Sequence, residues 1–181
     1  MTIRPWKVRP ASPSDAEAAH RLLLRSYSTL LPNDYSPEVL EVVLPIITKP
    51  SEELLTCGTW YLVEHPDEPS ELIGCGGWTR RRPGRPRTAE NDATVHLRHF
   101  ATDPDWTRQG IARAIWQRIR NDLADQQHQQ DPPMEVYSTR TGVPFYKSLG
   151  FQVMDDDITI AMGTISFPVV GMLRQQEDHR G

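Results

Sequence analysis

Hydrophobic and polar positions change their period along the chain, and the longest single pattern covers residues 93–127. Residues 93–102 are rich in β-branched and aromatic residues, which is typical of a strand. After the turn signal Asp103-Pro104-Asp105, apolar residues recur from Ile111 to Ala124 in steps of three, four and one. Such steps mark one face of an amphipathic helix. The pattern therefore predicts a strand, a loop and a long helix.

The rest of the chain alternates short apolar segments with turns rich in proline and glycine. Helix starts are indicated by Ser12-Pro13-Ser14-Asp15 and by Ser36-Pro37-Glu38, where a serine can cap the helix and a proline follows it. We expect strands at residues 6–11, 59–64, 71–79, 93–102, 134–139, 151–160 and 165–174. We expect helices at residues 16–27, 39–47, 51–55, 111–124 and 143–149.

The order of these elements predicts the sheet. A helix separates the strand at residues 93–102 from the strand at residues 134–139, so these two should be parallel neighbours. Hairpins join the other strands and make them antiparallel. We therefore predict an α+β domain over residues 1–174, followed by a charged tail at residues 175–181 that should be disordered. Residues 80–92, rich in arginine, are expected to form a polar loop, and residues 126–133 a polar linker.

The loop before the long helix has the residues of an anion site. Arg108-Gln109-Gly110-Ile111-Ala112-Arg113 places glycine and alanine where a helix begins, so backbone N–H groups and the helix dipole could meet a pyrophosphate. The alternative is a glycine that merely allows close packing of helix and strand. The loop alone favours neither interpretation.

Composition narrows the class of protein. The 181 residues are 38% hydrophobic and 24% charged, with a net charge of −4, which fits a globular protein and argues against nucleic acid as the main partner. No apolar run is long enough for a membrane span, and the N-terminus lacks the apolar region of a signal peptide. Cys57 and Cys75 lack metal or redox spacing. We therefore expect a cytoplasmic protein without metal.

Four stretches together resemble a known family. They are residues 8–15 (VRPASPSD), the glycine-rich residues 72–78 (LIGCGGW), residues 100–113 with the loop above, and residues 144–151 (PFYKSLGF). In this order they are similar to the GNAT superfamily of acetyl-CoA-dependent N-acetyltransferases. The resemblance implies a GNAT-like mixed, mostly antiparallel sheet with a central splayed parallel strand pair, flanked by helices.

The resemblance also implies acetyl-CoA as co-substrate and no metal. Thr139 stands where the family commonly has an asparagine that contacts the coenzyme, and its hydroxyl could substitute. Thr107 stands where the family's loop usually has glutamine or arginine. The residues implied for coenzyme binding are Phe100, Ala101, Thr102, Arg108, Gln109, Gly110, Ile111, Ala112, Arg113, Thr139 and Tyr146.

For catalysis, the resemblance implies direct attack of an amine on the acetyl thioester. Tyr146 is expected to be the general acid that protonates the leaving thiolate, and a backbone N–H near Phe100 to polarise the thioester carbonyl. The base is left open between His96, Glu135 and ordered water. Strand alternation places His96 and Arg98 on the same face as Phe100, opposite Val95, Leu97 and His99.

The acceptor is expected to be an amine of a small molecule or a peptide. Tyr27, Tyr35 and Trp78 are the residues proposed to contact it. The sequence does not identify this amine, the acyl chain preferred or the oligomeric state, for which a homodimer is one option. The sequence leaves two alternatives: a non-catalytic acyl-CoA-binding sensor or scaffold, and a nucleotide-binding domain.

Overall fold

The computed structural model describes residues 6–80, 94–126 and 132–175, and within them seven strands form one sheet in the order β1-β2-β3-β4-β5-β7-β6. The β4–β5 pair is parallel, and the other neighbouring pairs are antiparallel. The α+β sheet predicted from the sequence is confirmed. The strands are β1 (Val8–Pro10), β2 (Trp60–Glu64), β3 (Leu72–Thr79), β4 (Val95–Thr102), β5 (Met134–Ser138), β6 (Gln152–Met162) and β7 (Ile165–Arg174).

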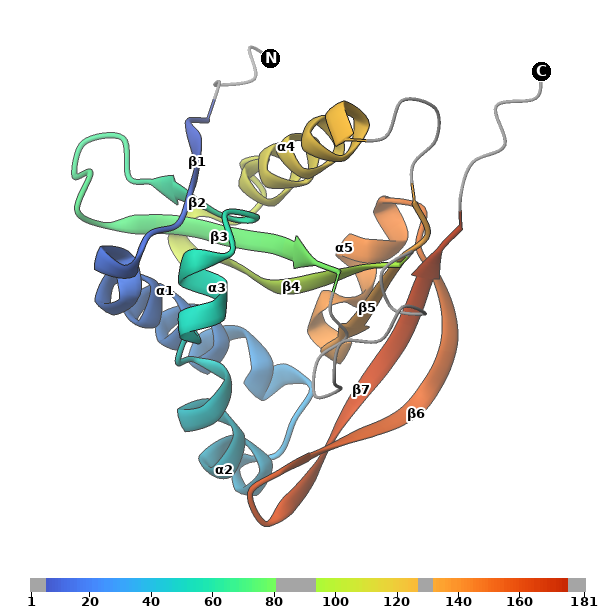
Figure 1. Ribbon diagram of the computed structural model, residues 1–181. Helices are drawn as coiled ribbons and strands as arrows, with labels where there is room; N and C mark the ends of the chain where they lie inside the picture. The colour runs from blue at the N-terminus through green and yellow to red at the C-terminus, as the bar shows by residue number, and fades with distance from the viewer. Residues whose placement is uncertain (1–5, 81–93, 127–131, 176–181) are drawn as a thin grey trace.

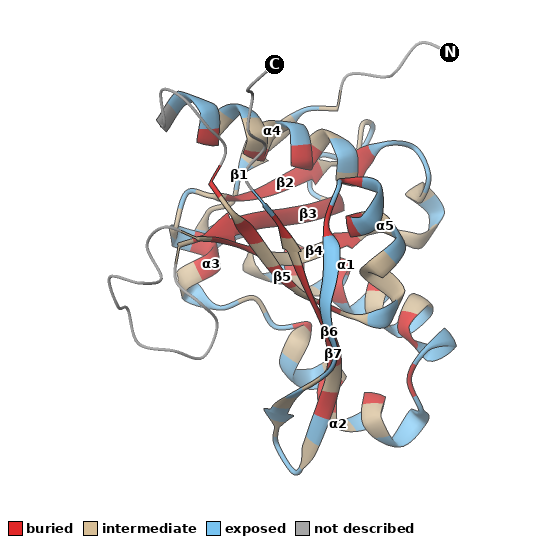
Figure 2. Cartoon of the chain, turned by 90° about the vertical axis from the view of Figure 1, so that its right-hand side faces the viewer, coloured by how far each residue is buried: buried red, intermediate tan, exposed pale blue. Residues whose placement is uncertain are grey.

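Helices lie on both sides of the sheet (Figure 1). The apolar stripe of α4 packs on one face in a cluster that includes Ile115 of α4 and Tyr146 of α5. On the other face, α1 and α3 pack through Leu23 and Leu54. The central strands are therefore buried on both faces, as Figure 2 shows for β2 and β3. The helices are α1 (Ala16–Leu30), α2 (Pro37–Ile47), α3 (Glu52–Thr56), α4 (Ile111–Gln126) and α5 (Val143–Ser148).

The long β6–β7 hairpin extends beyond the rest of the sheet, and α2 lies beside it (Figure 1). Val43 of α2 and Phe167 and Val169 of β7 form the centre of a third apolar cluster. This cluster holds the end of α2 next to the hairpin. Residues from both elements line the same cavity.

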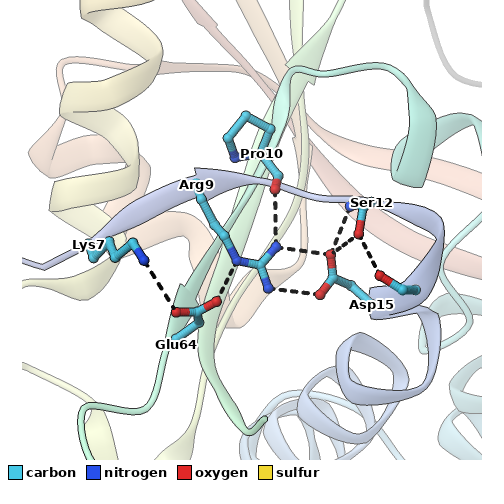
Figure 3. Close-up of polar contacts among 7 residues, drawn as sticks. Lys7, Arg9, Pro10, Ser12, Asp15 and Glu64 are labelled. Carbon is cyan, nitrogen blue, oxygen red and sulfur yellow. Dashed lines mark hydrogen bonds and ion pairs between the residues drawn. The ribbon is translucent and has the colours of Figure 1, made fainter. Parts of the chain in front are cut away.

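The start of α1 follows the capping signal in the sequence. Asp15 closes the 3₁₀ turn η1 (Pro13–Asp15), and its carboxylate accepts hydrogen bonds from Ser12 N and Ser12 Oγ, each at 2.8 Å. The same carboxylate forms a two-pronged ion pair with Arg9, which also contacts Glu64 of β2 (Figure 3). The Arg9 guanidinium lowers the pKa of Asp15 to about 2. This network joins β1, β2 and the first helix.

Some sequence predictions fall outside the described residues. They are most of the arginine-rich loop at residues 80–92, most of the linker at residues 126–133, and residues 176–181 of the tail. In the described part of the chain, no helix has both the length and the apolar character needed to cross a bilayer.

Candidate active site

The two parallel strands diverge soon after they meet. In the described strands, β4 and β5 pair at Val95–Met134 and His96–Glu135 and not beyond, although β4 continues to Thr102 and β5 to Ser138. The backbone groups of the diverging segments are therefore available to a ligand. Two cavities open at this divergence, and Leu97 and Val136 line both of them.

The first cavity, of about 730 Å³, lies between the end of β4, the start of α4, the diverging part of β5 and α5. Its volume is within the range of roughly 300–1,000 Å³ that is common for small-ligand and cofactor sites. Ten of the eleven residues expected to bind coenzyme line it; the exception is Gln109. The ten are Phe100, Ala101, Thr102, Arg108, Gly110, Ile111, Ala112, Arg113, Thr139 and Tyr146.

The loop before α4 has the conformation of an anion-binding turn. Arg108 and Gly110 have positive φ angles of 65° and 84°. The first bond of the helix runs from Ala114 N to Gly110 O at 2.9 Å, so the amides of Ile111 to Arg113 precede the intrahelical bonds. These amides lie at the positive end of the helix dipole and can bind phosphate oxygens. A Cβ on Gly110 would meet no atom within 4 Å, so close packing does not require a glycine here, and the anion site stays a prediction.

Contacts from distant parts of the chain hold this loop in place. Arg25 of α1 forms an ion pair with Asp103 at 2.9 Å and another with Asp105. The Trp6 indole donates a hydrogen bond to Gln109 O at 3.0 Å and packs edge-on against Trp106, with ring centroids 5.8 Å apart. Gln109 thus contributes to the loop through its carbonyl, which faces Trp6.

A β-bulge in β4 changes the face of the sheet to which the side chains after it point. The register with β3 jumps from Cys75–Ala101 to Gly77–Arg98, so two residues, His99 and Phe100, lie opposite Gly76 alone. His99 adopts a positive φ of 47° at this point. Phe100 consequently packs against the cluster that contains Val95 and Leu97. The sequence prediction that Phe100 shares a face with His96 and Arg98 was wrong, because simple alternation ignores the bulge.

The Phe100 ring covers Gly76 closely. A Cβ built on Gly76 would lie 2.7 Å from Phe100 Cδ1, a distance that allows no side chain there without a shift. On the opposite side, Tyr27 Oη donates a hydrogen bond to Phe100 O at 3.2 Å. These contacts fix the peptide groups of β4 where the resemblance expects the thioester.

Tyr146 lies on α5 and lines the first cavity. Its ring packs edge-on against Phe100 at 6.0 Å and Phe151 at 5.7 Å between centroids. Burial, with a smaller contribution from nearby Cys75, raises the pKa of Tyr146 well above its ordinary value. The phenol therefore keeps its proton at neutral pH.

The second cavity, of about 370 Å³, contains both candidate bases. His96 Nδ1 lies 3.1 Å from Glu135 Oε2, and the His96 side chain is only 4% exposed. A carboxylate at this distance accepts the Nδ1 proton and leaves Nε2 as the acceptor nitrogen. Among the described residues, His96 Nε2 is buried and has no hydrogen-bond partner. His96 and Glu135, which the sequence offered as alternatives, lie together as one close pair.

His99 lies where the two cavities meet, and the sequence did not single it out. Burial, and to a lesser degree the charge of Arg98, lower the pKa of His99 to about 4. Its imidazole is therefore neutral at neutral pH. Its position follows from the bulge, which lies opposite Gly76 in the glycine-rich strand β3.

The three expected substrate residues have different positions. Tyr27 lines both cavities. Tyr35 is buried under β7, where its hydroxyl donates to Pro168 O and accepts from Arg140 N. Trp78 is 4% exposed inside the core cluster below α4. Tyr35 and Trp78 line neither cavity, so their expected contact with substrate is corrected: both pack in the interior.

Thr139 lines both cavities and also caps a turn. Its hydroxyl oxygen accepts a hydrogen bond from Gly142 N at 3.2 Å at the start of η5 (Arg140–Gly142). The hydroxyl proton can still be donated to a ligand. The sequence missed several residues of the second cavity, which come from the end of α2, the segment after it and β6: Ile46, Ile47, Lys49, Ser51, Ile160 and Met162.

Comparison with known proteins agrees with this geometry. The sequence model of the acetyltransferase (GNAT) domain family matches residues 33–168, most of the chain. The protein therefore belongs to the GNAT acetyltransferase family. It is an acyltransferase. No curated protein sequence matches the chain significantly.

Solved structures share the fold at low sequence identity. A GCN5-related N-acetyltransferase from Rhodopseudomonas palustris has a TM-score of 0.74 at 14% identity, over 97% of this chain and 98% of that one. PaiA N-acetyltransferase from Thermoplasma acidophilum, solved in complex with coenzyme A, has a TM-score of 0.64 at 18% identity, over 93% and 98%. The Escherichia coli ribosomal-protein-S18-alanine N-acetyltransferase has a TM-score of 0.58 at 14% identity, over 97% and 96%.

Proposed function

We propose that the protein transfers an acetyl group from acetyl-CoA to a primary amine of a small molecule or peptide, by direct attack in a ternary complex. One observation carries the proposal: two cavities meet where β4 and β5 diverge, with Tyr146 in one and the His96–Glu135 pair in the other. A coenzyme in the first cavity and an amine in the second would meet at this point.

Coenzyme binding uses the backbone more than the side chains. The amides of Ile111, Ala112 and Arg113 bind the pyrophosphate, and Arg108 and Arg113 add positive charge at the same place. The diverging segment Phe100 to Thr102 offers its backbone groups to the pantetheine. The fit is supported by the positive φ angles of the loop and by the open space beside Gly110, where a Cβ would meet no atom within 4 Å.

The chemical step divides between the cavities. The amine nitrogen forms a bond to the thioester carbon, and the bond from that carbon to sulfur breaks. His96 Nε2 accepts the proton of the amine, directly or through water, while Glu135 holds the imidazole orientation. Tyr146 donates its proton to the departing sulfur. A backbone N–H near Phe100 stabilises the charge that develops on the carbonyl oxygen.

A thiol-release assay tests this function. Wild type and Tyr146→Phe are compared at saturating acetyl-CoA against a panel of primary amines. We expect turnover with at least one amine in wild type and a large loss in the variant. Equal rates would remove Tyr146 from the mechanism. Absence of turnover with every amine, while acetyl-CoA still raises the melting temperature, would favour a non-catalytic acyl-CoA sensor.

A further inference from the structure

The second cavity has an apolar wall on one side. Ile46 and Ile47 come from the end of α2, and Ile160 and Met162 come from β6. Ile46 is 46% exposed, which leaves a large aliphatic side chain open to solvent beside three other apolar residues. An aliphatic group of a substrate would cover this wall and be stabilised by the burial of apolar surface.

The other walls of the same cavity carry charge. Among its described lining residues, Lys49 and Arg98 are cationic, and Glu135 is the only anion and lies 3.1 Å from His96 Nδ1. Lys49 does not line the first cavity, so the pyrophosphate of the coenzyme does not account for it, whereas Arg98 already donates a hydrogen bond to Thr79 Oγ1 at 3.4 Å. This charge distribution favours an acceptor with a negative group and disfavours a polycationic amine.

The volume restricts the acceptor further. About 370 Å³ lies near the lower end of the range of roughly 300–1,000 Å³ for ligand pockets, which suits a small molecule. Building on the proposed acetyl transfer, we propose that the acceptor is a small aliphatic α-amino acid. Its amine faces His96, its carboxylate pairs with Lys49, and its side chain lies on the wall formed by Ile46, Ile47, Ile160 and Met162.

Because amines differ in basicity, the test compares each amine between wild type and a variant. L-leucine and isoamylamine have the same aliphatic chain, but isoamylamine lacks the carboxylate. We expect Lys49→Met to lower kcat/KM for L-leucine by roughly threefold to tenfold and to leave kcat/KM for isoamylamine unchanged. The matched control is Lys7→Met, which removes an exposed lysine of the segment before β1 and should change neither value.

A second comparison, between L-leucine and L-alanine, tests the apolar wall. Ile46→Ala should lower kcat/KM for L-leucine more than for L-alanine, because only leucine reaches the truncated side chain. Circular dichroism and the melting temperature check that each variant folds. Equal effects of Lys49→Met on L-leucine and isoamylamine would overturn the proposal. So would a wild-type preference for spermidine over L-leucine, although acetyl transfer itself would then stand. If the proposed acetyl transfer itself were wrong, the result would differ, because no amine would then cause release of thiol from acetyl-CoA.

Discussion

His96 Nδ1 lies 3.1 Å from Glu135 Oε2, across the last pair of residues at which β4 and β5 are joined. The parallel register brings these side chains together immediately before the strands diverge. The carboxylate orients the imidazole so that Nε2 is left to accept a proton. The pair therefore stands beside the gap in which the amine and the thioester are proposed to meet.

If His96 and Glu135 act as one unit, their substitutions should not be additive. We expect His96→Ala to lower kcat/KM about a hundredfold and Glu135→Gln about tenfold, with the double variant no worse than His96→Ala alone. Steady-state kinetics of the four proteins measure this.

His99→Asn is the control for a histidine that lines both cavities and has no proposed catalytic role. Burial lowers the pKa of His99 to about 4, so His99 is neutral above pH 5, and His99→Asn should leave the pH profile of kcat/KM unchanged above pH 5. Additive losses for the His96 and Glu135 substitutions would contradict their action as one unit.

Tyr146→Phe tests the proton donor. Burial keeps the Tyr146 pKa above its ordinary value, so the phenol stays protonated as pH rises towards 9 and adds no alkaline limb of its own. We expect kcat to fall about a hundredfold while KM for acetyl-CoA changes little. Tyr61→Phe is a matched control, because Tyr61 donates a hydrogen bond to Asp122 and lines neither cavity. A similar loss of kcat in both variants would indicate a structural effect.

Substitutions at Gly110 test the role of the anion loop, because they change only the backbone conformation that the loop can adopt. A Cβ at this position would meet no atom within 4 Å, but its φ of 84° strains a residue with a side chain. We expect Gly110→Ala to weaken acetyl-CoA binding by about 1 kcal/mol, roughly fivefold, as isothermal titration calorimetry would measure. Gly110→Asn should bind more tightly than Gly110→Ala, because asparagine tolerates positive φ. Equal affinities of wild type and Gly110→Ala would contradict the role of this turn.

Asp15 gives a prediction on stability. Because its pKa is lowered to about 2 in the folded protein, the Asp15 carboxylate stabilises the fold above about pH 4. That contribution is lost as pH falls from about 4 towards 2. We expect Asp15→Asn to reduce the free energy of unfolding by about 1–2 kcal/mol at pH 7 and by less at pH 3.

Urea unfolding at the two pH values measures the effect of Asp15. The control is Asp67→Asn, which changes an exposed acid between β2 and β3 and should have little effect at either pH. A loss in Asp15→Asn that is as large at pH 3 as at pH 7 would show that charge is not its cause.

Local patterns predicted the elements well, because capping residues and apolar periodicity act within one element. The capping sequence at Ser12 and the stripe that begins at Ile111 correspond to the observed α1 and α4. The crossover rule then predicted the parallel β4–β5 pair. These features can be predicted without knowledge of contacts between distant residues.

The details of the site depend on contacts between distant residues. Alternation could not reveal the bulge at His99, which reverses the face of Phe100. Aromatic residues suit both cavity walls and cores, so Trp78 was expected at the substrate site although it packs in the core. The contribution of Ile46 depends on how α2 packs beside the β6–β7 hairpin, which no local pattern encodes.

A crystal structure with acetyl-CoA bound tests the central claim most directly. We expect the pyrophosphate on the amides of Ile111 to Arg113, and the thioester beside Phe100 with its sulfur nearest to Tyr146. The acetyl group should point towards the second cavity and the His96–Glu135 pair. A coenzyme bound elsewhere, or a thioester remote from both Tyr146 and His96, would contradict the proposed division of the site.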